Sequence, residues 1–515
     1  MDYEELFDIK NAVDELVEDG MLNRRSVGDV IARVLPELVE RCGLRGAFFE
    51  TYAEDLALHH FGTSDIPGKE DVWTRTSETG REKVAAKRDG ALVCAQHLDV
   101  AGTWFGRAGF VCAPDADPER MLACLESACE VLDNYLFAIR AAREKHEVTM
   151  KLGKALRHRV LAQGLKDAVC VLADALPIDR LLLVCLAEES ATKTLHVQQY
   201  RGKEVVVDTL SAHGDTLAPV RLLGRRYLAG ESNELLAELG IHDAQEEVLI
   251  NGITKSVVVG KVVVTSKTGG FNTYDRELLA SFAGFIRQRV VDFNKEWRSL
   301  AYSFRADDVA RLLRDDEYEK RFLAPREEKV AILYADIAGF TRLSETVLKT
   351  PANVAALVEA WSRDAVEIVF AHGGVFDKMV GDCVIALFGP PFYDEPPGKR
   401  LEQALQCAKE IRSMTNQFSK RVGFEHLAEQ GLGVSTGVNL ASLFVGQFGP
   451  NSNFTGFSSG MNNTARLQGC AHRDEILVMD DAIAELPSGH GFAFGEARTA
   501  LVKNVAEPLR FRPLV

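Results

Sequence analysis

The stretch VAILYADIAGF, residues 330–340, is an apolar run of strand length that ends on an acid, Asp336, and a turn of small residues. A second stretch, VFDKMVGDCVIALF at residues 375–388, contains two alternating runs joined at Gly381-Asp382, a pair typical of a hairpin turn. If the strands are neighbours, Asp336 and Asp382 meet at one end of a sheet. We therefore predict a pair of carboxylates at strand ends.

Two carboxylates at one point repel each other and raise each other's pKa unless a cation neutralises them. Mg²⁺ is a hard ion that commonly binds one or two carboxylates together with the phosphates of a nucleotide. The turn after Asp336 leads into a predicted helix containing Leu357 and Trp361, so its backbone N–H groups are placed to face a polyphosphate. Taken alone, Asp336 or Asp382 is more simply explained as a turn former or helix cap.

Three segments in order resemble the site motifs of class III nucleotidyl cyclases: YADIAGFT at 334–341, KMVGD at 378–382 and FTGFSSGMNNTARL at 454–467. The match departs at Ser458, where the family usually has Gly, and at Tyr334, where Phe is common. Neither change removes a charged group. The resemblance covers about 190 residues, and three spaced motifs in order make it more specific than any one acid.

The resemblance implies attack of a ribose 3′-oxygen on the α-phosphorus of a nucleoside triphosphate, with pyrophosphate leaving. It implies two Mg²⁺ or Mn²⁺ ions per site, which lower the pKa of the 3′-hydroxyl and hold the triphosphate. The implied metal ligands are Asp336, Ile337 and Asp382. The turn residues implied to contact the triphosphate are Gly339, Phe340 and Thr341.

Further positions follow from the same resemblance. Asn462 and Arg466 lie four residues apart on one helical face and are the implied catalytic pair, which stabilises charge on the α-phosphoryl oxygens. Lys378 and Thr455 match the positions that read adenine, so the expected substrate is ATP. Lys503 matches a lysine that contacts the terminal phosphates, although Asn504 replaces the usual Gly after it.

In this family the site lies between two catalytic domains, so a homodimer with two equivalent sites is expected. Guanylate cyclase is one alternative, which Glu at position 378 would have favoured. A catalytically silent nucleotide-binding module is another, which loss of an acid, Asn or Arg would have favoured. A diguanylate-forming enzyme is a third, but it would carry a Gly-Gly-Asp/Glu-Glu-Phe turn where this chain has VGDCV at 380–384.

The chain has 515 residues, a length that favours roughly three domains. A formal net charge of −15 argues against non-specific binding to nucleic acid or an anionic membrane. No apolar run reaches the length of about 18 residues that a membrane span needs, and the acidic start MDYEE does not resemble a signal peptide. We therefore expect a cytoplasmic protein whose ten cysteines are buried free thiols.

Residues 1–145 are predicted to form a helix, antiparallel strands and a long closing helix, and this order recurs in residues 150–295. The second copy ends in Phe271-x-x-x-Asp275 followed by a Leu-Leu-x-x-Phe-Ala run, and resembles a GAF domain, a small-molecule sensor with a central antiparallel sheet. The first copy is a weaker match. The resemblance implies an unidentified small-molecule ligand. A cyclic nucleotide is one candidate; the open alternatives are another ligand, or a purely structural contact between a lysine and an aspartate of the motif.

Residues 296–325 are expected to form a coupling helix, because apolar residues such as Phe304 and Val309 recur at helical spacing and would form a short coiled coil with a parallel partner. A solvated linker is the alternative. Residues 326–515 alternate strands and helices, with a hairpin between two helices. The expected fold is thus α/β (α+β): two GAF-like antiparallel-sheet domains followed by a ferredoxin-like α/β sandwich that carries the class III cyclase site.

Overall fold

The computed structural model describes residues 3–53, 55–63, 83–100, 103–188, 193–210, 217–251, 258–428, 431–450, 452–501 and 508–515. Their contacts form two units. One unit comprises Met1–Lys154, Val171–Leu176 and Phe271–Phe282, and the other comprises the remaining residues. None of the described helices combines the length and hydrophobicity that crossing a bilayer requires. The cysteines are free thiols and most are buried, as predicted.

The first unit contains an antiparallel sheet whose described strands follow the order β2-β1-β5-β4-β3. The strands are β1 Gly46–Tyr52, β2 Leu58–Gly62, β3 Lys83–Arg88, β4 Ala91–Val100 and β5 Thr103–Cys112. The helices are α1 Tyr3–Leu22, α2 Val27–Cys42 and α4 Pro118–Ala155. Helix α2 begins where the Ser26 hydroxyl accepts a hydrogen bond from the Asp29 N–H, and it ends at Gly43, whose φ of 60° suits a residue without a β-carbon. Its apolar face packs into the core of this sheet.

A second antiparallel sheet has its described strands in the order β8-β7-β6-β10-β9. The strands are β6 Ile178–Glu188, β7 Lys193–Arg201, β8 Glu204–Asp208, β9 Glu246–Asn251 and β10 Val258–Ser266. The accompanying helices are α5 Leu161–Ala175, α6 Ala218–Leu228, α7 Glu234–Glu238 and α8 Thr273–Ala301. When the strands of each sheet are numbered one to five along the chain, both sheets contain the order 2-1-5-4. The third strand lies at opposite edges of the two sheets. An internal duplication requires such a shared order.

The Phe-x-x-x-Asp signature has a local structural role at the start of α8. The Asn272 N–H donates to the Asp275 carboxylate at 3.0 Å, and the Asp275 N–H donates to the Asn272 side chain at 2.9 Å. This reciprocal pair satisfies two backbone donors that the first helical turn leaves free. Asp275 therefore acts here as a helix cap.

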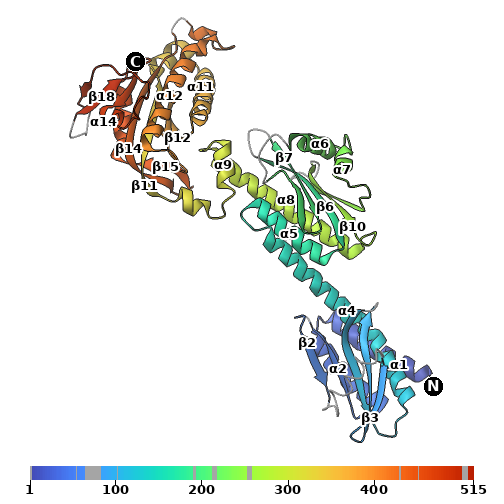
Figure 1. Cartoon of the computed structure of the whole chain (residues 1–515). Coiled ribbons are helices and arrows are strands. Elements are labelled where there is room, and N and C mark those ends of the chain that lie inside the picture. Colours follow the sequence, from blue (N-terminus) through green and yellow to red (C-terminus); the bar gives the residue numbers. More distant parts are fainter. Residues whose placement is uncertain are drawn as a thin grey trace. The chain divides into compact units, whose positions relative to one another are not determined.

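The third sheet lies in the C-terminal part of the chain, and its described strands follow the order β12-β13-β11-β14-β16-β18-β17, with β15 paired to β14 (Figure 1). The strands are β11 Arg326–Ile337, β12 Gly374–Val380, β13 Cys383–Phe388, β14 Val434–Phe448, β15 Asn453–Phe457, β16 Ile476–Met479, β17 Arg498–Ala500 and β18 Leu509–Pro513. Only β14 and β16 pair in parallel among these described strands. The order β12-β13-β11-β14, with helices after β11 and β13, is the predicted ferredoxin-like arrangement.

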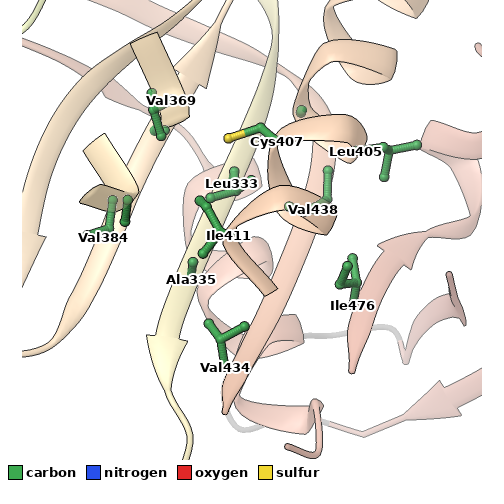
Figure 2. Close-up of a cluster of buried hydrophobic side chains, with 14 of the residues drawn as sticks. Leu333, Ala335, Val369, Val384, Leu405, Cys407, Ile411, Val434, Val438 and Ile476 are labelled. Carbon is green, nitrogen blue, oxygen red and sulfur yellow. The ribbon is translucent and has the colours of Figure 1, made fainter. Parts of the chain in front are cut away.

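Helices cover both faces of this sheet. Helices α11 Pro351–Ala371 and α12 Pro397–Gln417 pack side by side on one face (Figure 1). Helix α13 Ser459–Cys470 packs on β11 and β14 from the other face. The shorter helices are α10 Phe340–Leu343 and α14 Asp480–Ile483, and a π-helical turn, Ser344–Leu348, follows α10. Figure 2 shows the core beneath α11 and α12, where Leu333 and Ala335 of β11 lie beside Ile411 of α12. The predicted mixed α/β fold with a mainly antiparallel sheet is confirmed.

The segment expected to form a coupling helix is interrupted, because α8 ends at Ala301 and the next helix, α9 Ala306–Leu312, begins after a break. The Ser303 carbonyl leaves the helix and accepts a hydrogen bond from the Phe376 N–H at 2.9 Å. Phe304 and Val309 are buried within the chain, with Phe304 packed edge-to-face on Phe454. Neither residue is therefore available for a coiled-coil seam, since an apolar side chain can fill only one core.

Candidate active site

The two predicted acids lie together at one end of the third sheet. Leu333, Ala335 and Ile337 of β11 face the core beneath α11 and α12. Because side chains alternate along a strand, Asp336 points to the opposite face, toward α13. Asp382 lies in the two-residue turn between β12 and β13, where Gly381 adopts a φ of 64° that favours a residue without a β-carbon.

The two carboxylates share one partly buried environment. Burial raises the pKa of Asp336, while contacts with Asp382 and Gln468 lower it. Burial, followed by the charge of Asp336, raises the pKa of Asp382 to about 7, although nearby backbone N–H groups, including that of Ile337, oppose this. The Oδ2 atom of Asp382 is buried and has no hydrogen-bond partner among the described residues. The site thus holds carboxylate oxygens that lack a positive partner.

This arrangement fits a hard divalent cation. Mg²⁺ prefers oxygen ligands and is usually held by one or two carboxylates plus water and phosphate, so a cluster of three or more side-chain ligands is not required. Among the described residues no such larger cluster of His, Cys, Asp or Glu occurs. Asp336 and Asp382 are the side chains that would hold the ion, and the Ile337 carbonyl follows directly in the chain.

The raised pKa of Asp382 predicts a pH-dependent stability in the metal-free chain. A folded pKa of about 7, above the ordinary 3.8, means that the folded state holds a proton which the unfolded state has lost. The stability contribution is present below the ordinary value and is lost as the pH rises through about 7. In EDTA, the melting temperature of the wild type should therefore decrease relative to that of Asp382→Asn as the pH rises from roughly 5 to 8. Saturating Mg²⁺ should remove this difference. Identical pH profiles of wild type and variant in EDTA would contradict this.

The predicted base-reading pair is also assembled. The Lys378 ammonium on β12 donates to the Thr455 hydroxyl on β15 at 3.2 Å, and it lies 3.6 Å from the Asp377 carboxylate. The side chain of Asp377 is fully buried, whereas that of Lys378 is 45% exposed. Burial raises the pKa of Asp377, and the Thr455 hydroxyl and Lys378 oppose that shift. A donor and an acceptor thus lie side by side, which is the pattern needed to read the edge of a nucleobase.

Among the described residues, no hydrogen bond or ion pair joins the other predicted residues to these two clusters. Asn462 is exposed and Arg466 half-buried on α13, and within the described residues neither side chain has a hydrogen bond or ion pair. Gly339, with a φ of 71°, forms the turn before α10, where Phe340 is half-buried and Thr341 exposed. Lys503 lies outside the described residues.

The sequence analysis missed one residue of the acid site, Gln468. Its side-chain amide donates to the Ser435 hydroxyl at 2.9 Å and lies 3.5 Å from the Asp336 carboxylate. Gln468 follows Arg466 by two positions on α13, and a helix places such residues on different faces. Only the packing of α13 against β11 and β14 brings it to the acid, so no sequence signal marked it.

The C-terminal part of the chain is similar in sequence to known proteins. Residues 322–509 match the model of the adenylate and guanylate cyclase catalytic domain. Adenylate cyclase 1 of Rhizobium meliloti (strain 1021) is 25% identical over 189 residues, 36% of this chain and 25% of that protein. The adenylate cyclase of Anabaena cylindrica is 22% identical over 174 residues, 33% of this chain and 33% of that protein. The matched part is about a quarter to a third of the length of these relatives.

Part of the chain also aligns with solved structures of cyclases. The adenylyl cyclase CyaB from P. aeruginosa aligns with a TM-score of 0.33 and 24% identity over 38% of this chain and 96% of that chain. The guanylyl cyclase Cya2 aligns with a TM-score of 0.33 and 19% identity over 37% of this chain and 93% of that chain. The family match and the assembled acids together indicate a catalytic domain of the adenylate and guanylate cyclase class in residues 322–509.

Proposed function

We propose that the protein is an adenylate cyclase that converts ATP to 3′,5′-cyclic AMP and pyrophosphate. The observation that carries this choice is the contact between Lys378 and Thr455. An ammonium can only donate, so it suits the unprotonated N1 of adenine and opposes the N1–H of guanine. The Thr455 oxygen already accepts from Lys378, and its second lone pair can accept from the exocyclic amine of adenine. Guanylate cyclase remains the alternative, since the family match covers both activities.

The reaction needs charge compensation around the triphosphate. Two Mg²⁺ or Mn²⁺ ions, when bound, would lower the pKa of the 3′-hydroxyl and neutralise phosphate charge. Asp336 and Asp382, at the end of the sheet, are the side chains that would hold these ions, and Gln468 orients the Asp336 carboxylate. Arg466 and Asn462 supply a positive charge and an amide donor for the α-phosphoryl oxygens.

We propose that these two sets of residues meet across a homodimer. Arg466 and Asn462 have no bond to either acid within the described chain, which leaves them available to a second copy. Exposed apolar side chains surround the base-reading pair: Val380 at the end of β12, Phe444 on β14 and Phe457 on β15. The centroid of the Phe448 ring lies 5.9 Å from that of Phe444 and 5.0 Å from that of Phe457. Contiguous exposed aromatic surface of this kind indicates a protein interface.

The N-terminal sheets are proposed as GAF-like sensors of an unidentified small molecule that regulate the cyclase in signal transduction. Glu296 on α8 supports a mechanical connection, because its carboxylate accepts from the Tyr318 hydroxyl at 2.8 Å and from Arg159 at 3.2 Å. Arg159 precedes α5, and Tyr318 precedes the catalytic domain. One side chain therefore ties the second sheet's helices to the segment that enters the cyclase.

The test is an assay of the purified full-length chain with ATP or GTP and Mg²⁺ or Mn²⁺, detecting cyclic products. We expect cyclic AMP from ATP and a preference over GTP of at least about tenfold, the range for one charged hydrogen bond. A matched assay of residues 302–515, which keep Phe304 and its packing on Phe454, should differ in activity because the sensors are absent. Formation of cyclic GMP as the main product would favour guanylate cyclase, and no product from either nucleotide would favour the silent binding module.

A further inference from the structure

Asp377 occupies an irregular position on β12. The pairing of β12 with β13 shifts register between Phe376 and Lys378, so Asp377 is the extra residue of a β-bulge. In a regular strand, Asp377 and Lys378 would point to opposite faces of the sheet. Here the Asp377 carboxylate lies 3.6 Å from the Lys378 ammonium.

The bulge is held from outside the sheet. β12 is an edge strand, and edge strands leave backbone groups without a strand partner. The Phe376 N–H, directly before the bulge, donates to the Ser303 carbonyl at 2.9 Å. The break between α8 and α9 therefore supplies the partner that this distorted edge needs.

Asp377 lies at the wall of a partly open cavity that has both polar and apolar lining. It lines a cavity of about 250 Å³ together with Lys378, Thr455, Ser303 and Phe304. Its side chain is 0% exposed, and neither carboxylate oxygen has a well-formed hydrogen bond among the described residues. A buried carboxylate without partners is strongly unfavourable. The Lys378 ammonium is the cation that lies close enough to compensate it.

We propose that Asp377 is a positioning residue that holds the Lys378 ammonium beside Thr455 and thereby sets the preference for adenine. This rests on the proposed function, in which Lys378 reads the base. The Lys378 side chain is flexible and 45% exposed, so on its own it would sample many rotamers. Attraction to the buried Asp377 carboxylate restricts those rotamers. A role in holding the backbone is not seen, since no described N–H donates to the Asp377 carboxylate.

The test compares Asp377→Asn, Lys378→Met and the double variant in the full-length chain. The readouts are the ratio of kcat/KM for ATP and GTP and the ratio of ATP to GTP binding in equilibrium dialysis with the radiolabelled nucleotides. We expect Asp377→Asn to lower both ratios about tenfold, mainly through KM for ATP, and to change nothing further in the Lys378→Met background. Asp364→Asn is the matched control, because this largely buried acid on α11 pairs with Arg421 instead, and it should keep both ratios.

An equal loss for ATP and GTP in Asp377→Asn overturns the inference, and so does an undiminished effect in the Lys378→Met background. If Asp377→Asn fails to fold, Asp377→Ser is measured in the same way. If the wild type binds ATP in preference to GTP but forms no cyclic product, the proposed function fails while the dialysis ratios still decide the role of Asp377. Equal binding of ATP and GTP by the wild type overturns the inference itself.

Discussion

Asp336→Ala and Arg466→Ala are each expected to lose about 10³-fold in cyclic AMP formation, the range for removing one essential electrostatic contact in an active site. An equimolar mixture of the two variants should recover about one quarter of wild-type activity. Random pairing makes half of the dimers mixed, and each mixed dimer has one intact site out of two. The physical reason is the proposed homodimer, in which the acid and the arginine of one site come from different copies.

The matched control for this experiment mixes Asp336→Ala with Asp382→Ala. Both acids belong to the same half of the site, so a mixed dimer contains no intact site and activity should stay absent. The measurement is cyclic AMP formation after the variants are expressed together, with the dimer checked by size-exclusion chromatography. Recovery in the control mixture, or none in the first mixture despite dimer formation, would contradict a shared site.

Phe304→Ala is expected to destabilise the C-terminal part of the chain by about 3–5 kcal/mol, the usual cost of truncating a buried Phe. The Phe304 ring is 2% exposed and lies 4.9 Å from the Phe454 ring, so its loss leaves a cavity. Phe454 directly precedes Thr455, and we therefore expect the KM for ATP to rise as well. Urea unfolding and steady-state kinetics measure the two effects.

Tyr302→Ala provides the comparison, because Tyr302 lies two residues away in the same segment and is 63% exposed. Truncation of an exposed side chain usually changes stability by less than about 0.5 kcal/mol. Equal and small costs at both positions would show that the segment between α8 and α9 is not packed on the catalytic sheet in solution.

Much of the acid site could be predicted from local chemistry. The alternation of apolar residues before Asp336 and the Gly381-Asp382 turn each specify a strand end, and neighbouring strands bring the two ends together. The contact between Lys378 and Thr455 was expected from resemblance alone, since 77 residues separate them in the chain. Their specific chemistry on ATP and the domain limits stay predictions.

Other features depended on contacts that a linear pattern does not contain. The apolar spacing of Phe304 and Val309 favoured a continuous helix, but the hydrogen bond from Phe376 to Ser303 and the packing of Phe304 on Phe454 outweigh that local preference. Register shifts such as the one at Asp377 arise when two strands pair, so a single strand does not reveal them.

The sequence by itself determined the candidate residues for catalysis and binding, namely the acids, the lysine, the asparagine and the arginine that its motifs contain, and their roles stay predictions. It also determined the strands and turns that place Asp336 and Asp382 at one sheet end, because period-two patterns and turn residues act locally. The tertiary structure alone decided that Gln468 reaches Asp336, that Asp377 is buried beside Lys378, and that α8 stops short of α9. Those outcomes depend on which surfaces compete for the same buried space, and that competition exists only once the chain has folded.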